Sequence, residues 1–105
     1  MSADDTPPIA CTLDASEVPE RLARWAELAR HVRERSTIAD GVRVTFDPTV
    51  AAATVAELAA EELACCAFLS FSLRLDAGTI TLDVTAPAEA RELVDLLLLP
   101  PDAAA

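Results

Sequence analysis

Two adjacent cysteines, Cys65 and Cys66, are the residues of this chain with the clearest capacity for chemistry. They follow Glu62 in an alanine-rich segment whose apolar residues recur at helical spacing. On a helix at about 100° per residue, Glu62 falls near the middle of the apolar side, one turn before Cys66. A buried carboxylate is costly unless it is paired or protonated, so this placement predicts a functional site.

A third cysteine, Cys11, lies in an alternating segment, residues 9–13, which predicts a short strand with Cys11 facing the core. Cys66 faces inward from the helix, and Cys65 lies at the edge of the same face. We therefore expect the three thiols to converge beside Glu62. Three thiolates suit a soft metal or metalloid ion, and Glu62 or water would complete a tetrahedral zinc site. Copper is a further candidate ion.

The local charge favours cation capture over a reactive thiolate. A helix C-terminus carries partial negative charge, and Glu61 and Glu62 add to it. Both effects disfavour a spontaneously formed thiolate, whereas a bound metal ion replaces thiol protons directly. Arg43 and Arg74 would reverse this argument if they reached the site, but both are expected on outward strand faces.

Other interpretations stand beside metal binding. In the first, the protein is a small enzyme in which Cys66 or Cys65 attacks an electrophile or carries sulfur, with Glu62 as general acid or base. In the second, exposed Phe68 and Leu69 form part of a homodimer contact. In the third, the cysteines are small core hydrophobes and Glu62 lies at a ragged core edge.

The composition restricts both the location and the partners of the protein. The chain has 105 residues, is 52% hydrophobic and carries a formal net charge of −10, which predicts one domain and excludes direct binding to phosphate backbones. No apolar run approaches the roughly 20 residues of a membrane span, and no secretory signal begins the chain. We therefore expect a cytoplasmic protein, with no nucleic acid or membrane partner and with reduced thiols.

The hydrophobic patterning predicts an α+β fold of order β-α-β-α-β-β-α. Amphipathic helices are expected from about Ser16 to Val32, from Asp47 to Cys66 or Phe68, and after Ala86-Pro87. Besides residues 9–13, strands are expected at residues 42–46, 71–75 and 79–85. Each strand has one apolar face, which predicts a two-layer sandwich with a four-stranded sheet covered on one face by three helices. Residues 36–41 are a connection and residues 76–78 a hairpin turn. Residues 1–8 are a flexible leader, 9–99 a single domain and 100–105 a tail.

One part of the sequence resembles a known group of proteins. The run Glu62-x-x-Cys65-Cys66-x-Phe68-x-x-Phe71 is similar to a motif of small actinobacterial proteins and of C-terminal modules on MerR-type heavy-metal regulators. The opening around Cys11, an arginine-rich helix with Trp25, and Ala86-Pro87 match as well. The resemblance implies that Cys11, Glu62, Cys65 and Cys66 bind a soft metal or metalloid ion, with mercury the first expectation. Without a helix-turn-helix, it does not carry over a regulator's role.

Overall fold

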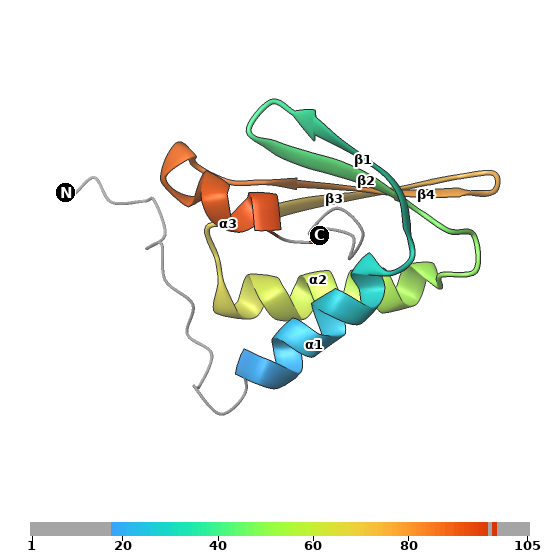
Figure 1. Ribbon diagram of the computed structural model, residues 1–105, viewed down its shortest axis with the longest axis horizontal. Coiled ribbons are helices and arrows are strands. Elements are labelled where there is room, and N and C mark those ends of the chain that lie inside the picture. The colour runs from blue at the N-terminus through green and yellow to red at the C-terminus, as the bar shows by residue number, and fades with distance from the viewer. Residues whose placement is uncertain (1–17, 97, 99–105) are drawn as a thin grey trace.

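The computed structural model describes residues 18–96 and 98. Over these residues the chain forms three α-helices, a short 3-10 helix and one four-stranded sheet (Figure 1). The elements in chain order are α1 (Val18–Ala29), β1 (Val32–Ile38), β2 (Gly41–Phe46), α2 (Ala52–Cys65), β3 (Ser70–Asp76), β4 (Thr79–Thr85), the 3-10 helix η1 (Ala88–Ala90) and α3 (Arg91–Leu96).

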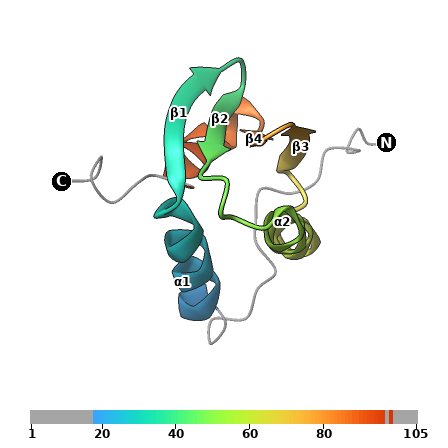
Figure 2. The same ribbon diagram turned by 90° about the vertical axis from the view of Figure 1, so that its right-hand side faces the viewer.

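The sheet is antiparallel throughout, with strand order β1-β2-β4-β3. The three helices lie on one side of it, as the two perpendicular ribbon views show (Figures 1 and 2). This confirms the predicted α+β class, in which a four-stranded sheet is covered on one face by three helices. Among the described residues, no helix combines the length and the apolar character needed to cross a membrane.

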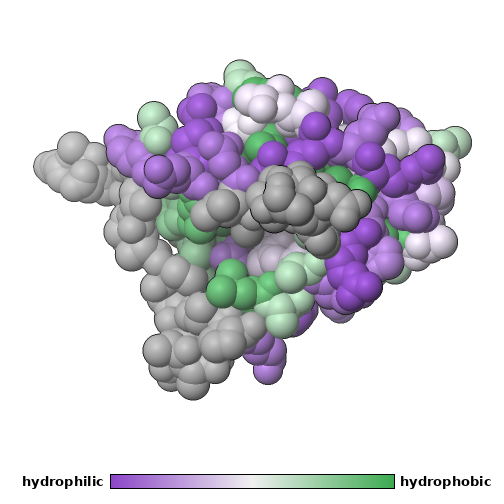
Figure 3. Space-filling view, in the orientation of Figure 1, coloured by the Kyte–Doolittle hydropathy of each residue, from purple (hydrophilic) through white to green (hydrophobic). Residues whose placement is uncertain are grey.

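The core lies between the sheet and the helices. Along β2, buried Val42, Val44 and Phe46 alternate with half-buried Arg43 and Thr45, as period-two patterning requires. Strand β4 and all three helices add further buried side chains, among them Leu82, Val84, Trp25, Leu28, Val55, Leu58 and Val94. In a space-filling view, hydrophilic side chains dominate the sheet side, with hydrophobic side chains scattered among them, and a further hydrophobic patch shows at the level of α2 (Figure 3).

One strand differs from the prediction. The patterning placed a helix up to Val32 and a connection over residues 36–41, but Val32–Ile38 forms edge strand β1, which pairs with β2 from Val32↔Phe46 to Ile38↔Gly41. Apolar residues stand only at the two ends of this strand, so it lacks the alternating pattern of a half-buried strand. The strand predicted at residues 9–13 lies outside the described residues, which run in the order α-β-β-α-β-β-α.

The start of α2 also differs. Asp47 was expected to cap this helix, yet helix geometry begins at Ala52 after an Ala51 N-cap without a side-chain bond. Asp47 instead organises the preceding turn, because its Oδ1 accepts from the Thr49 amide at 3.0 Å and its carbonyl oxygen accepts from the Val50 amide at 3.0 Å. The local hydrogen bonds of an aspartate thus favour the turn over the helix.

The turns between strands are tight. The predicted turn at residues 76–78 is confirmed, with Asp76 paired to Thr79 and Gly78 at φ 73°. Gly41 opens β2 where a β-carbon would lie 1.8 Å from the Val84 carbonyl oxygen, so the close approach of β4 requires glycine there. The predicted leader and the predicted tail at residues 100–105 lie outside the described residues.

Candidate functional site

The candidate site lies where α2 ends and the chain turns into β3. Helix geometry holds through Cys65, and Cys66 leaves it with φ −124° and ψ 76°. The Cys66 amide still donates to the Glu62 carbonyl oxygen at 2.6 Å, and the Leu69 amide donates to the Cys66 carbonyl oxygen at 3.1 Å. The adjacent cysteines therefore stand at the helix end, on a backbone that hydrogen bonds fix on both sides.

Glu62 is buried on α2, with 8% of its surface exposed. Its Oε1 accepts hydrogen bonds from two groups of α1, Trp25 Nε1 at 2.8 Å and Arg21 Nη1 at 3.2 Å. The predicted inward placement of this carboxylate is confirmed. Its partners were not predictable from the sequence, and they supply the opposite charge and the donors that burial of a carboxylate requires.

The two partners are fixed by their spacing on α1. Arg21 and Trp25 lie one turn apart, so both side chains project from the same face of the helix. Trp25 is 3% exposed, and its ring stacks on that of Phe71 in β3, with centroids 5.9 Å apart and planes 11° apart. An arginine one turn before an inward tryptophan was the available signal that α1 carries a charge toward the core.

A second ion pair lies beside the first, nearer to solvent. Arg24 binds both oxygens of the Glu61 carboxylate, and Arg21 Nη2 lies 3.9 Å from Glu61 Oε1. The hydrogen bond from Arg24 lowers the pKa of Glu61 below its ordinary value. These side chains are 40% and 43% exposed, so water screens the pair and it adds little to stability. Two arginines of α1 therefore face two carboxylates of α2.

The two thiols have different surroundings. Cys66 is a core residue with 2% of its surface exposed, whereas Cys65 is half-buried, and neither forms a disulfide. Burial disfavours the charged form of Arg21, but hydrogen bonds to Glu62 and to Cys65 outweigh it and raise the pKa of this guanidinium. Arg21 therefore contacts the carboxylate of Glu62 and the sulfur of Cys65 together.

Arg21 changes the expected electrostatics of the thiols. From the sequence, Arg43 and Arg74 were the two cations weighed as neighbours of the site. Each of these is paired elsewhere, Arg43 with Asp83 at 2.8 Å and Arg74 with Asp76 at 3.1 Å. The cation beside the thiols comes instead from α1, and it offsets the negative charge of the helix end that the sequence analysis emphasised.

Three of the four predicted metal ligands, Glu62, Cys65 and Cys66, lie among the described residues. Cys11 lies outside the described residues. Within residues 18–96 and 98, no group of three or more His, Cys, Asp or Glu side chains is placed to hold a metal ion. What the described residues bring together is Glu62, Arg21 and Cys65, with Cys66 on the core side. A metal site that includes Cys11 stays a prediction.

One further expectation concerns two residues just after the site. Phe68 and Leu69, taken as exposed residues for a homodimer contact, are 7% and 3% exposed. That premise is wrong, because the turn after α2 directs both side chains into the core.

Comparison of the chain with protein-family models, with curated proteins and with solved structures gave no match. The resemblance to modules of heavy-metal regulators therefore stays a prediction.

Proposed function

We propose that this protein binds a soft metal or metalloid ion, such as Hg(II), through the thiols of Cys65 and Cys66, with Cys11 as a third ligand. The observation that carries the proposal is the pair of adjacent cysteines at one helix end, neither in a disulfide, with Cys65 half-buried. Sulfur ligands select soft ions over the hard cations that carboxylates prefer. The formal charge of −10 favours the approach of a cation.

The neighbouring charges fit an entering cation. Around the thiols, Arg21 and Arg24 are each paired with a carboxylate of α2, so the cluster is close to neutral before an ion binds. Binding of the ion removes the thiol protons, and the resulting thiolates neutralise its charge. Glu62 is already engaged by Trp25 and Arg21, so its role in this proposal is to hold Arg21 against Cys65 rather than to bind the ion.

Native mass spectrometry of the reduced protein with Hg(II), Cd(II), Zn(II), Cu(I) and arsenite tests the proposal. We expect one soft ion per chain, with ultraviolet bands of sulfur-to-metal charge transfer. Cys65→Ser and Cys66→Ala should each weaken binding strongly, and Cys11→Ser should weaken it less while leaving a two-thiol complex. Stoichiometric binding by none of the ions, or equal binding by a Cys65→Ser/Cys66→Ala variant, would overturn the proposal.

A second candidate function is a small enzyme that uses a thiol nucleophile. The contact of Arg21 with both Cys65 and Glu62 favours it, because a nucleophile, a cation and a carboxylate then lie together. Of the two cysteines, Cys65 is the one with access to solvent, while Cys66 is buried. Glu62 would act as general acid or base.

Alkylation kinetics separate the two functions. The rate of iodoacetamide modification is measured against pH in a Cys11→Ser/Cys66→Ala variant, which leaves Cys65 as its one thiol. If Cys65 is an enzyme nucleophile, it should be alkylated at pH values well below about 8.5, where a free thiol ionises. Arg21→Met should remove that advantage. An alkylation profile that matches free cysteine would exclude the enzyme and leave metal binding as the proposal.

A further inference from the structure

Strand β3 forms one edge of the sheet, and none of the described residues pairs with its outer side. It pairs with β4 over all its residues, from Ser70 to Asp76, in an unbroken register. The other edge strand, β1, has an irregular register between Val32 and Glu34 and carries charged residues at positions 33–35. Bulges and charges of this kind protect an edge from pairing with another chain, whereas β3 has neither a bulge nor a proline. The open edge of β3 is therefore a template for a further strand.

The helix-facing side of β3 is only partly covered. Phe71 and Leu73 are half-buried against the core, and Leu75, which follows them on the same side of the strand, is 61% exposed. In the neighbouring strand β4, by contrast, Leu82 and Val84 are fully buried on this side. Strand β3 thus exposes apolar surface beside its unpaired backbone, because it has a neighbouring strand on one side only.

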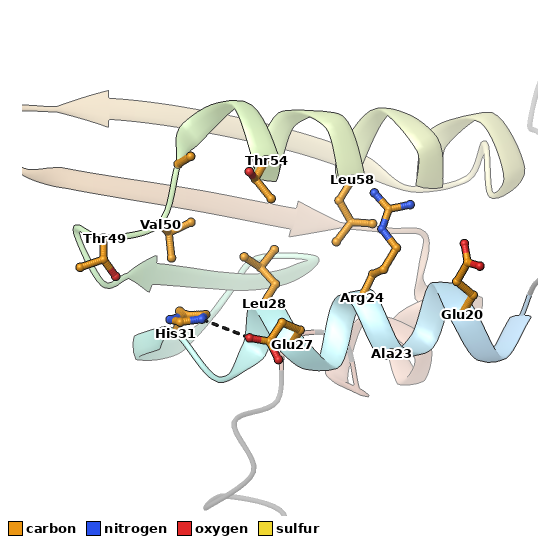
Figure 4. Close-up of a pocket in the computed structure, with 11 residues that line it drawn as sticks. Glu20, Ala23, Arg24, Glu27, Leu28, His31, Thr49, Val50, Thr54 and Leu58 are labelled. Atoms are coloured by element: carbon orange, nitrogen blue, oxygen red, sulfur yellow. Dashed lines mark ion pairs between the residues drawn. The ribbon is translucent and has the colours of Figure 1, made fainter.

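A second exposed apolar side chain lies on the same edge of the molecule. Helix α2 runs beneath β3, whereas α1 lies beneath β1 (Figure 2). Thr54 and Leu58 of α2 point toward α1 (Figure 4). At roughly 100° per residue, Leu63 projects from the opposite side of α2, and this side chain is 38% exposed. Leu75 in the sheet and Leu63 in the helix layer therefore border the open edge together.

We propose that a second copy of this chain pairs with β3, so that two antiparallel β3 strands join the two four-stranded sheets edge to edge. A two-fold axis through Leu73 places this residue opposite its own copy and Phe71 opposite Leu75. Each exposed Leu75 then packs on a phenylalanine ring of the other copy, which removes apolar surface from water. The helices of both copies lie on one face of the joined sheet, with the two α2 helices as neighbours and Leu63 between them.

The side chains on the solvent face of β3 select this register. It places Ser72 opposite Arg74 of the second copy and Ser70 opposite Asp76, so each charged group faces a hydroxyl, which both donates and accepts hydrogen bonds. A two-fold axis through Arg74 would oppose two arginines, which destabilises a sheet. An axis through Ser72 would leave Leu75 beyond the end of the other strand. The complementarity of β3 to its own copy is what identifies a second copy as the occupant of this edge.

The test combines sedimentation velocity with isotope-filtered NOE spectra of a mixture of labelled and unlabelled full-length protein. The protein is kept reduced and free of metal ions, so the result does not depend on the thiol site. We expect a species of twice the mass of the chain, with contacts between copies from the Phe71 ring to the Leu75 methyl groups. A monomer at every concentration, contacts between copies on other surfaces, or pairing of β3 with residues 9–13 of the same chain would overturn the proposal.

Charge variants at Ser72 test the register. Ser72→Lys opposes a lysine to Arg74 of the second copy, and it should raise the dissociation constant of the dimer by roughly 2- to 30-fold, because two such pairs form by symmetry. Ser72→Glu should lower the dissociation constant by a similar factor. Ser36→Lys and Ser36→Glu are the matched controls, since Ser36 is exposed on the other edge strand, and they should leave it unchanged. Equal effects of lysine and glutamate at Ser72, or the same changes in the controls, would overturn the proposal.

Removal of exposed apolar surface gives a second line of evidence. Leu75→Ser should raise the dissociation constant of the dimer by at least about 10-fold, because the two-fold axis places two copies of this leucine in the contact. Leu22→Ser is the matched control, since Leu22 is 59% exposed on α1, beneath the opposite edge of the sheet, and should leave the dissociation constant unchanged. Both substitutions change exposed side chains, so circular dichroism should show the fold unchanged. Equal dissociation constants of the Leu75→Ser and Leu22→Ser proteins would overturn the proposal.

Discussion

Replacement of Arg21 by methionine should destabilise the protein far more than the same replacement of Arg24. Arg21 donates to a carboxylate that is 8% exposed, and the side chains of Arg21 and Glu62 are 14% and 10% exposed. Removal of one partner of a fully buried pair costs about 3–5 kcal/mol. Because some solvent reaches this pair and Trp25 Nε1 still donates to Glu62, we expect a loss of about 2–3 kcal/mol for Arg21→Met.

Urea unfolding followed by tryptophan fluorescence measures this loss directly. The chain has one tryptophan, Trp25, and it is buried against the pair, so its emission reports the state of the site itself. Arg24→Met is the matched control and should change stability little, since its partner Glu61 is 43% exposed.

A double-mutant cycle then isolates the interaction between the two side chains. Glu62→Gln keeps an acceptor for Trp25 and removes the charge, so the Arg21→Met/Glu62→Gln protein should be more stable than the sum of the single losses predicts. We expect a coupling of about 2 kcal/mol. A coupling near zero, or equal losses for Arg21→Met and Arg24→Met, would refute the conclusion that Arg21 is what compensates Glu62 burial.

Three further expectations follow from other parts of the fold. The hydrogen bond from Arg43 lowers the pKa of Asp83, so the unfolded chain binds a proton at this residue more readily than the folded protein does. The resulting stabilisation is complete above the ordinary aspartate pKa of about 3.9 and is lost as pH falls through the lowered pKa of the folded protein. In urea unfolding measured against pH, Arg43→Met should therefore reduce the loss of stability at acid pH. Gly41→Ala should cost about 3 kcal/mol or more in the same assay, because the new β-carbon meets the backbone of β4. Iodoacetamide followed by peptide mass spectrometry should modify Cys65 in the native protein and Cys66 only after denaturant is added, since Cys66 is 2% exposed.

The fold was predictable wherever burial of one face produces a periodic pattern of apolar residues in the sequence. β2 and β4 are central strands with one face in the core, so their apolar residues alternate and both were predicted from the sequence. β1 is an edge strand held by backbone pairing to β2, and its central residues are polar. Every residue type except proline can both donate and accept a backbone hydrogen bond, so such pairing leaves no pattern in the side chains. The later start of α2 has the same origin, since a turn around Asp47 competes locally with helix formation.

The sequence predicted that Glu62 is buried, but it did not predict which residue compensates its charge. Helical spacing placed Glu62 on an apolar face, and in the structure Glu62 is buried on that face of α2. The identity of its partner depends on how α1 packs against α2, which joins residues 41 positions apart along the chain. Periodicity within one helix carries no information about that pairing. For this reason the sequence offered cations only on the strands, Arg43 and Arg74, whereas the cation beside Glu62 is Arg21 of the preceding helix.

The partners of Glu62 change what the motif means. A buried carboxylate beside adjacent thiols indicates a ligand set only while its burial is otherwise unexplained. Arg21 and Trp25 explain it through opposite charge and two hydrogen bonds, so Glu62 needs no metal ion to be stable where it is. Cys65, the half-buried residue at the end of α2, is a thiol that hydrogen-bonds to the same Arg21 guanidinium. The chemical case therefore rests on Cys65, next to a guanidinium that the ion pair with Glu62 keeps in place.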